Sequence, residues 1–338
     1  MSRKYSIVFA IVTMFASVLA PTLSAQNGYP FNDPCFYWGT GLVPPFPANA
    51  VQPCACWFPG CTCPLRGNCP PGNAASETRS DCPNCGQPIS LVTGNTFIEE
   101  IDVRVPGISG GLSLNRRWNS LWPVSQAASQ VGLFGPNWRS SYEERVFSDG
   151  NGYIKYARSD GSFWSFYFAG PAWSVAAPAN ATASLAQGTS YWTLTFQNGE
   201  KRLFDVNSGN LTSIIDRNGN ATQISYDATG RLSTVTDPAS RHLYFGYQNS
   251  GSTLVTSVTS DVGIALSYAY DSQGRLILVT KPDSTTITFQ YNTQSLITSV
   301  LDSNGVVLES HTYDSLGRGL TSSKAGGVDA VTVSYPNQ

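Results

Sequence analysis

The chain has 338 residues, of which 12% are charged, and its formal net charge is −2. No basic stripe accompanies this near-neutral balance, which argues against nucleic acid as a partner. The length is sufficient for a sizeable core. With so few charges, solubility depends on Ser, Thr, Asn and Gly, as it often does in exported β proteins.

The N-terminus has the pattern of a secretory signal. Arg3 and Lys4 precede the apolar run IVFAIVTMFASVLA, and the small-residue segment PTLSA follows. A charged region, an apolar region and a small-residue cleavage site occur in this order in signal peptides. Because Pro21 disfavours a cut after Ala20, we predict cleavage after Ala25. The apolar run is too short for a comfortable membrane span. The sequence therefore predicts a signal peptide (1–25) and a mature protein that is soluble and secreted or at the cell surface.

A Cys- and Pro-rich segment follows, over residues 26–86, and holds all eight Cys. An even number of Cys in an exported chain favours disulfides, which would restrain a segment too rich in Pro to build its own core. Two C-x-C pairs and a C-x-x-C also fit thiolate binding of zinc or an iron–sulfur centre, although such a site would have to stay reduced. The pairing stays open, and the disulfide candidates are Cys35, Cys54, Cys56, Cys61, Cys63, Cys69, Cys82 and Cys85.

Residues 87–203 contain no Cys and six of the eight Trp, and they have the pattern of β-strands. ISLV and TFIEEIDVRV flank a Gly-Asn turn. YIKYAR and SFWSFYF form one predicted hairpin, and YWTLTF and KRLFDV form another around Asn198-Gly199, the pair that two-residue hairpin turns prefer. The sequence predicts a loop over residues 171–189. The β pattern continues into the next region without a linker.

One string in this region fits a hydrolase motif. Gly107-Ile108-Ser109-Gly110-Gly111 matches G-x-S-x-G, which marks a nucleophile elbow when a strand precedes it, a helix follows and a His activates the Ser. Both flanks here are strand-like, and the two histidines, His242 and His311, lie far along the chain as ordinary strand residues. We therefore interpret the string as a glycine-rich turn between two strands, and we predict no catalytic residue, no cofactor and no metal site.

Two acidic clusters were considered as paired carboxylates for glycosidase chemistry. Adjacent strand residues point to opposite faces, so Glu99 cannot share a face with Glu100. At most Glu100 and Asp102 share one, and Arg104 continues that row. We predict a charged outer face, and the same interpretation covers the second cluster, Glu143 and Glu144. Asp, Asn and Gly at the turns follow hairpin spacing rather than that of a calcium-binding repeat.

From residue 204 the chain is periodic. YDATGRLSTVTD at 226 returns as YDSQGRLILVTKPD at 270 and as YDSLGRGLTSSKAG at 313, and successive aromatics are 22, 21, 23, 21, 22 and 22 residues apart. A fixed period in the twenties indicates a repeat array. Each period has an Asp-to-Gly turn, a strand, a midpoint turn and a second strand. The repeat-defining residues are Phe204, Asp205, Tyr226, Asp227, Gly230, Tyr247, Tyr270, Asp271, Gly274, Tyr291, Tyr313, Asp314 and Gly317.

These repeats resemble the tyrosine–aspartate (YD) repeats of RHS proteins, which are kin to toxin-complex components and teneurins. The segments GQPISLVTGNTFIEEIDVRVPGISGGLSLNRRWNS and GLFGPNWRSSYEERV resemble the head domain that precedes those repeats. The resemblance extends from about residue 87 to the end. It implies a long β-sheet that spirals into a hollow shell, often around a toxic C-terminal domain. The proteins concerned are exported effectors of microbial competition, or adhesion proteins.

The sequence departs from that family in one respect, because the paired DPxGL motif of a self-cleaving core is missing. Asp237-Pro238-Ala239-Ser240 is the midpoint turn of a repeat. We interpret residues 204–338 as about six YD repeats of a truncated array. The predicted fold is all-β, with antiparallel hairpin repeats in a curved, open sheet.

Two functions remain open at this point. The first is an exported, non-enzymatic structural or interaction module, the N-terminal part of a shell-type protein in intercellular competition. Its expected partners are further YD repeats or another chain, paired at an exposed edge near AVTVSY. The second is a module that binds carbohydrate or another cell's surface through the Trp-rich region. The periodic tyrosines are expected in the core rather than at a sugar site.

Overall fold

The computed structural model describes residues 88–91, 93–122, 130–170, 172–178 and 181–335. These residues are β-strands and turns almost throughout, and helix is limited to short 3-10 turns such as Ile108–Gly110 and Ala325–Gly327. No helix in this part of the chain is long and apolar enough to cross a membrane. The predicted signal peptide (1–25) and the Cys-rich segment (26–86) lie outside the described residues.

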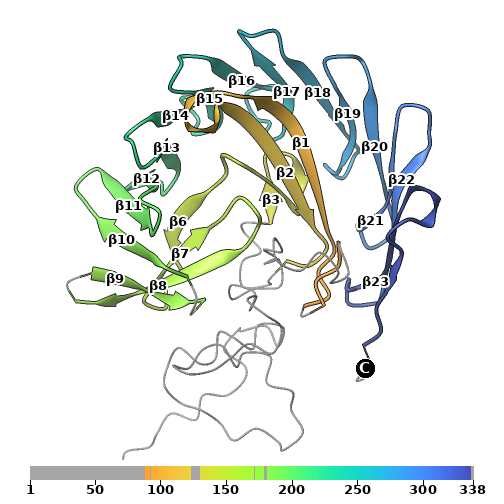
Figure 1. Cartoon of the computed structure of the whole chain (residues 1–338), viewed down its shortest axis with the longest axis horizontal. Helices are drawn as coiled ribbons and strands as arrows, with labels where there is room; N and C mark the ends of the chain where they lie inside the picture. The colour runs from red at the N-terminus through yellow and green to blue at the C-terminus, as the bar shows by residue number, and fades with distance from the viewer. Residues whose placement is uncertain (1–87, 92, 123–129, 171, 179–180, 336–338) are drawn as a thin grey trace, which may run out of the picture.

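One large antiparallel sheet, here called the outer sheet, contains nineteen strands in chain order and curves into an arc (Figure 1). Each strand pairs with the next along the chain, as consecutive hairpins require. Its strands are β6 Arg145–Ser148, β7 Tyr153–Ala157, β8 Phe163–Ala169, β9 Ala172–Ala177, β10 Ala183–Gln187, β11 Tyr191–Phe196, β12 Lys201–Asp205, β13 Leu211–Ile215, β14 Ala221–Tyr226, β15 Leu232–Thr236, β16 His242–Tyr247, β17 Val255–Ser260, β18 Ala265–Tyr270, β19 Leu276–Thr280, β20 Thr286–Tyr291, β21 Ile297–Leu301, β22 Val307–Tyr313, β23 Gly319–Lys324 and β24 Val331–Thr332.

The outer sheet is open, as predicted. Among the described residues no run of paired strands joins β24 to β6, and Figure 1 shows the ends of the arc apart. At its first strand the chain instead bends back onto the turn between β12 and β13, where Val146 N donates to Gly209 O at 2.9 Å. The curved, open YD-repeat sheet that the sequence predicts is confirmed.

The repeat unit also has the predicted form of two strands and two turns. Gly230, Gly274 and Gly317 lie at φ +81°, +74° and +80°, a region that glycine enters without a steric cost. In each unit most of the buried inner-face residues are apolar, as with Ile224 and Val235, while Gln223 and Ser225 face outward. Period-two alternation therefore decides which face of the outer sheet carries the core.

A second, smaller sheet lies inside the curve of the arc, beneath β15–β19 in Figure 1, and is here called the inner sheet. It has the order β1-β2-β5 and a β-bulge between Ile101 and Val103. Buried residues of both sheets form one core cluster. The strands of the head region are β1 Phe97–Val105, β2 Leu112–Asn119 and β5 Trp138–Ser140, with a two-stranded ribbon of β3 Val131–Gly132 and β4 Gly135–Pro136.

Two predictions about local structure are wrong. The predicted loop over 171–189 contains two strands, β9 and β10, which pair with each other and with β8 and β11. Their alanine-rich sequences lack strong β propensity, and the packing of Trp173 against Phe168 and Trp192, at 5.3 and 5.7 Å between ring centroids, decides the outcome. The predicted strand ISLV is reduced to a single bridge between Ile89 and Thr96.

Candidate functional site

A buried ion pair joins the inner sheet to the outer sheet. Arg116 of β2 is 1% exposed, and its Nη2 donates to Asp102 Oδ1 of β1 at 2.8 Å, while its Nε also contacts Asp102 Oδ2. Tyr268 of β18 completes the group, because its hydroxyl donates to Asp102 Oδ2 at 2.7 Å. We call these three residues the joint. It connects residues 166 positions apart in the chain.

The electrostatics of the joint follow from burial. Burial, the largest single influence, lowers the pKa of Arg116, but the charge and hydrogen bond of Asp102, together with Tyr268 and Glu100, outweigh it, so the pKa is raised and the guanidinium stays charged. Burial, together with the charge of Asp102, raises the pKa of Tyr268. The guanidinium also lies over the rings of Trp138, Phe134 and Tyr268, with its central carbon 4.7–5.4 Å from their centroids.

Asp102 therefore corrects the prediction of a charged outer face. It occupies the β-bulge between Ile101 and Val103, and the bulge interrupts the alternation on which that prediction relied. The Asp102 carboxylate is 1% exposed, whereas Arg104 is exposed, so the two do not continue one row. Glu100 is partly buried, and burial raises its pKa although Arg116 opposes the shift.

The second acidic cluster is also internal rather than part of an outer face. Glu144 is buried, and its Oε2 accepts hydrogen bonds from the Tyr156 hydroxyl at 2.7 Å and from Arg202 Nε at 3.0 Å. The neighbouring Glu143 accepts a hydrogen bond from Leu133 N at 2.7 Å through Oε1, and burial raises its pKa. Both carboxylates therefore accept hydrogen bonds from neighbouring groups inside the protein.

Aromatic pairs extend the joint along the arc. Phe134 packs on Tyr268 with ring centroids 4.8 Å apart, and Trp138 packs edge-on against Phe289 at 5.2 Å. Trp118 of β2 meets a repeat tyrosine of β22 at 6.4 Å. Trp118 and Trp138 are fully buried, and Trp192 is 8% exposed. These tryptophans of the middle region are thus core residues, which leaves them unavailable for stacking on sugar rings.

Hydrogen bonds to three main-chain carbonyls also connect the head region to the repeats. Gly319 N donates to Gly94 O at 2.8 Å, and Val255 N donates to Leu133 O at 2.9 Å. At the far end of β1, Arg241 Nη1 donates to the carbonyl of Pro106 at 3.1 Å. The inner sheet is therefore held against the repeats by side-chain, aromatic and main-chain contacts together.

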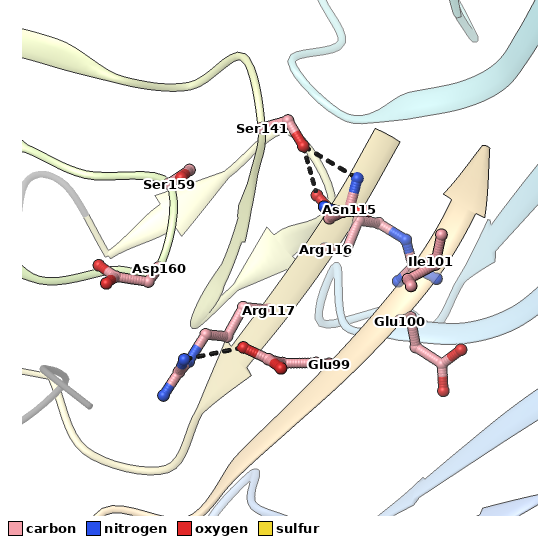
Figure 2. Close-up of a pocket in the computed structure, with 9 residues that line it drawn as sticks. All are labelled: Glu99, Glu100, Ile101, Asn115, Arg116, Arg117, Ser141, Ser159 and Asp160. Carbon is pink, nitrogen blue, oxygen red and sulfur yellow. Dashed lines mark hydrogen bonds and ion pairs between the residues drawn. The ribbon is translucent and has the colours of Figure 1, made fainter. Parts of the chain in front are cut away.

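A charged pocket of about 220 Å³ lies on the other face of the inner sheet, next to the β7–β8 turn (Figure 2). Arg117 Nη1 donates to Glu99 Oε1 at 2.8 Å, and the Ser141 hydroxyl accepts a hydrogen bond from Asn115 N at 2.9 Å. Burial would raise the pKa of Asp160 on the opposite wall, but nearby arginines keep it below its ordinary value. The pocket is lined by charges of both signs, three carboxylates (Glu99, Glu100 and Asp160) and two arginines (Arg116 and Arg117).

The repeat tyrosines form a ladder of hydrogen bonds on the inner face of the outer sheet. Each hydroxyl donates, at 2.6–2.8 Å, to the carbonyl of the first residue of a strand 15 or 16 positions earlier. Each repeat is thereby tied to the one before it. The donor and acceptor pairs are Tyr226–Leu211, Tyr247–Leu232, Tyr270–Val255, Tyr291–Leu276, Tyr313–Ile297 and Tyr335–Gly319.

The Asp and Arg of the repeat phrase tie neighbouring repeats together as well. Asp227 accepts hydrogen bonds from the Thr229 hydroxyl and from Arg231 N, which lower its pKa, and it also binds the Arg231 guanidinium. That guanidinium lies over the ring of Tyr247 in the next repeat, 4.3 Å from its centroid. The same arrangement recurs at Asp271–Arg275–Tyr291 and Asp314–Arg318–Tyr335. The Asp and Arg of each repeat motif therefore hold its turn against the tyrosine of the next repeat.

The hydrolase-like string forms the predicted turn. Gly107–Gly111 joins β1 to β2 through one 3-10 turn. His242 Nδ1 lies 2.7 Å from Asp261 Oδ2, and its ring stacks on Tyr244, which alternates with the buried core residues of β16. Within the described ranges, no hydrogen bond links Ser109 to His242 or to Asp261. His311 is buried in β22, close to Glu309. In this part of the chain no group of three or more His, Cys, Asp or Glu is arranged to hold a metal ion.

Sequence reasoning did not find the joint. Its signal is the pair Arg116-Arg117 inside a strand of otherwise core character, LSLNRRWN. Arginines are rarely buried unless they are paired, so this pair called for a buried carboxylate. Strand alternation in the sequence predicts an outer face for its partner, Asp102, which the bulge overturns.

Comparison with known families assigns the chain. The model described as "RHS Repeat" matches residues 207–242, 251–286 and 270–307, where the tyrosine ladder lies. The chain contains RHS repeats. The model described as "Domain of unknown function (DUF6531)" matches residues 86–166, which include the inner sheet and β6–β8.

The chain is distantly similar to several solved structures. "Crystal Structure of TcdB2-TccC3-Cdc42" is 12% identical with a TM-score of 0.29, over 68% of this chain and 15% of that one. "Crystal Structure of TcdB2-TccC3 without hypervariable C-terminal region" is 14% identical with a TM-score of 0.29, over 70% and 16%. The Photorhabdus luminescens Tc holotoxin pore is 11% identical with a TM-score of 0.26, over 68% and 14%. The chain thus spans about one seventh of their length. A search of curated proteins finds no match.

Proposed function

We propose that this RHS-repeat protein is an exported, non-enzymatic structural module in which a head domain fills and fixes the first turn of a repeat shell. The joint supports this proposal, because it places an ion pair of the inner sheet, Arg116 and Asp102, in hydrogen-bond contact with Tyr268 of a repeat strand.

The experiment that tests the structural role is thermal unfolding of the purified protein by calorimetry and by near-ultraviolet circular dichroism. The two tryptophans of the inner sheet, Trp118 and Trp138, report on the head, and far-ultraviolet signal reports on the repeats. A structural module predicts coincident transitions from both probes. Head and repeats that melt separately would contradict it, since the head would then be an independent domain.

Export and the division of the N-terminal region are further parts of the proposal. We propose a signal peptide over 1–25, a disulfide-restrained segment over 26–86, a head over 87–203 and repeats over 204–338. Intact mass of the exported protein is expected to place the new N-terminus at Gln26. Thiol counting on the denatured, unreduced protein is expected to find few free thiols. About eight free thiols with stoichiometric zinc would assign the segment to metal binding instead.

The role in intercellular competition is the broadest part of the proposal, and the family assignment supports it. A strain that lacks the gene is expected to be outcompeted by neighbouring cells in co-culture. Reintroducing the wild-type gene is expected to restore its competitive fitness. A partner strand that pairs with β24 stays a prediction. Light scattering of the protein and of Val333→Lys tests it, because added charge on a strand edge opposes pairing. If wild type and Val333→Lys are both monomers, the prediction of a partner strand at β24 is wrong.

A further inference from the structure

A second pocket, of about 250 Å³, lies where the 131–145 segment meets the turns of the first repeats. Its walls are mainly apolar and include Leu133, Leu232 and the ring of Tyr142. Three arginines line it, Arg139, Arg145 and Arg231. No residue of the joint lines this pocket, whereas two residues of the tyrosine ladder, Tyr226 and Leu232, form part of its wall.

The charges around this pocket do not balance. Glu144 is committed to Arg202 and Tyr156. Arg231, also in the lining, is committed to Asp227 and to three backbone carbonyls. Of the lining carboxylates, Glu143 alone is not committed elsewhere, and it lies near Arg139 and Arg145. Its Oε1 is 3.9 Å from Arg139 Nη1.

Arg145 is the cation without a counterion. It is half-buried, it makes no salt bridge within the described residues, and its Nε is buried without a hydrogen-bond acceptor. Among the described residues, its guanidinium carbon lies 4.8 Å from the centroid of the Phe147 ring. Burial lowers its pKa with no opposing charge, and Arg145 in turn lowers the pKa of Arg139 beyond the larger effect of burial. The buried Nε without an acceptor carries a desolvation cost, which a hydrogen-bonding anion would offset.

We propose that this pocket binds a carboxylate on a short apolar stem, with Arg145 as its counterion. One unbalanced positive charge fits a monoanion, and the planar guanidinium matches the two oxygens of a carboxylate. The apolar walls fit the stem that carries it. Such a group is found on a small carboxylic acid and on an acidic peptide side chain. The proposal is independent of export and of any role in competition.

The test measures thermal unfolding of the purified full chain at constant ionic strength, with sodium chloride replaced stepwise by sodium butyrate. We expect a saturable rise in Tm with butyrate, whereas inorganic phosphate is expected to give none. A short neutral-capped peptide with one glutamate serves as the second carboxylate. Stronger binding of the peptide would identify an acidic side chain as the source, and stronger binding of butyrate would identify a small acid. No saturable effect of either carboxylate would overturn the proposal.

Variants locate the effect. Arg145→Met keeps the length of the side chain and removes its charge, so we expect butyrate binding to weaken by about tenfold or more. Arg104→Met is the matched control, since Arg104 is exposed on β1 and lies outside the pocket. We expect this variant to bind butyrate as tightly as wild type. Equal butyrate binding by Arg145→Met would also overturn the assignment. Saturation-transfer NMR of butyrate on the wild type gives a readout that does not depend on the folding of a variant.

Discussion

The inner and outer sheets are stabilised in opposite ways. The outer sheet is made of consecutive strands, and its tyrosine hydroxyls reach carbonyls only 15 or 16 residues away. The inner sheet is held by contacts such as Asp102 to Tyr268, 166 residues apart. The outer sheet can therefore tolerate the loss of one unit's contact. The inner sheet depends on a few buried groups, each of which is costly to disrupt.

The largest effect is expected at the joint. Asp102→Ala leaves Arg116 charged and buried without its carboxylate, which should lower the free energy of unfolding by about 3–5 kcal/mol. Chemical denaturation monitored by tryptophan fluorescence gives this value. The double variant Asp102→Leu with Arg116→Met removes both charges and is expected to recover much of the loss. A double variant no more stable than Asp102→Ala would show that the ion pair is not the source of the effect.

The next largest effect is expected at the repeat turns. Gly230→Val and Gly274→Val place a β-branched side chain at positive φ, which should cost about 1–3 kcal/mol each. No atom lies within 4 Å of the Cβ position at Gly230, so backbone strain alone is expected to act there. Ser233→Val in the following strand is the matched control, with a smaller expected change. Equal melting of all three variants would show that the turn conformation does not limit stability.

A smaller effect is expected for one rung of the tyrosine ladder. Tyr291→Phe removes the hydrogen bond to Leu276 O, 2.7 Å long, and should lower stability by about 1 kcal/mol. Tyr244→Phe, on the exposed outer face, is the control with little expected change. Urea midpoints of the two variants and wild type provide the comparison. A Tyr291→Phe midpoint equal to that of Tyr244→Phe would mean that the ladder contributes little.

The ladder also predicts loss of stability in alkali. Burial raises the pKa of the repeat tyrosines Tyr226, Tyr247, Tyr270 and Tyr291 above the ordinary value of about 10. A phenol with a raised pKa in the folded state contributes stability that is present below pH of about 10 and is lost as pH rises toward the folded pKa. Phenolate absorbance is expected to appear together with unfolding. Full ionisation near pH 10 with the fold intact would contradict their burial.

The sequence predicts β1, β2 and most strands of the outer sheet, but not the contacts that join the two sheets, for a physical reason. Tyr226, Asp227 and Gly230 act within a unit or on its neighbour, so their spacing carries the geometry. Asp102 acts through a bulge and through Tyr268, and no local pattern reveals either. Strands β9 and β10 were missed because pairing with β8 and β11 outweighs their weak propensity. Burial of Glu144 likewise depends on Arg202, 58 residues away.

The most direct test of the central claim, that head and repeats form one structural unit, is hydrogen exchange measured by mass spectrometry. Peptides from β2 and from β18 are compared in wild type and Asp102→Ala. A shared unit predicts similar protection of both strands in wild type and a parallel loss of protection in both in the variant. Loss of protection in β2 with β18 unchanged would contradict the claim, because the repeats would then hold their structure without the head.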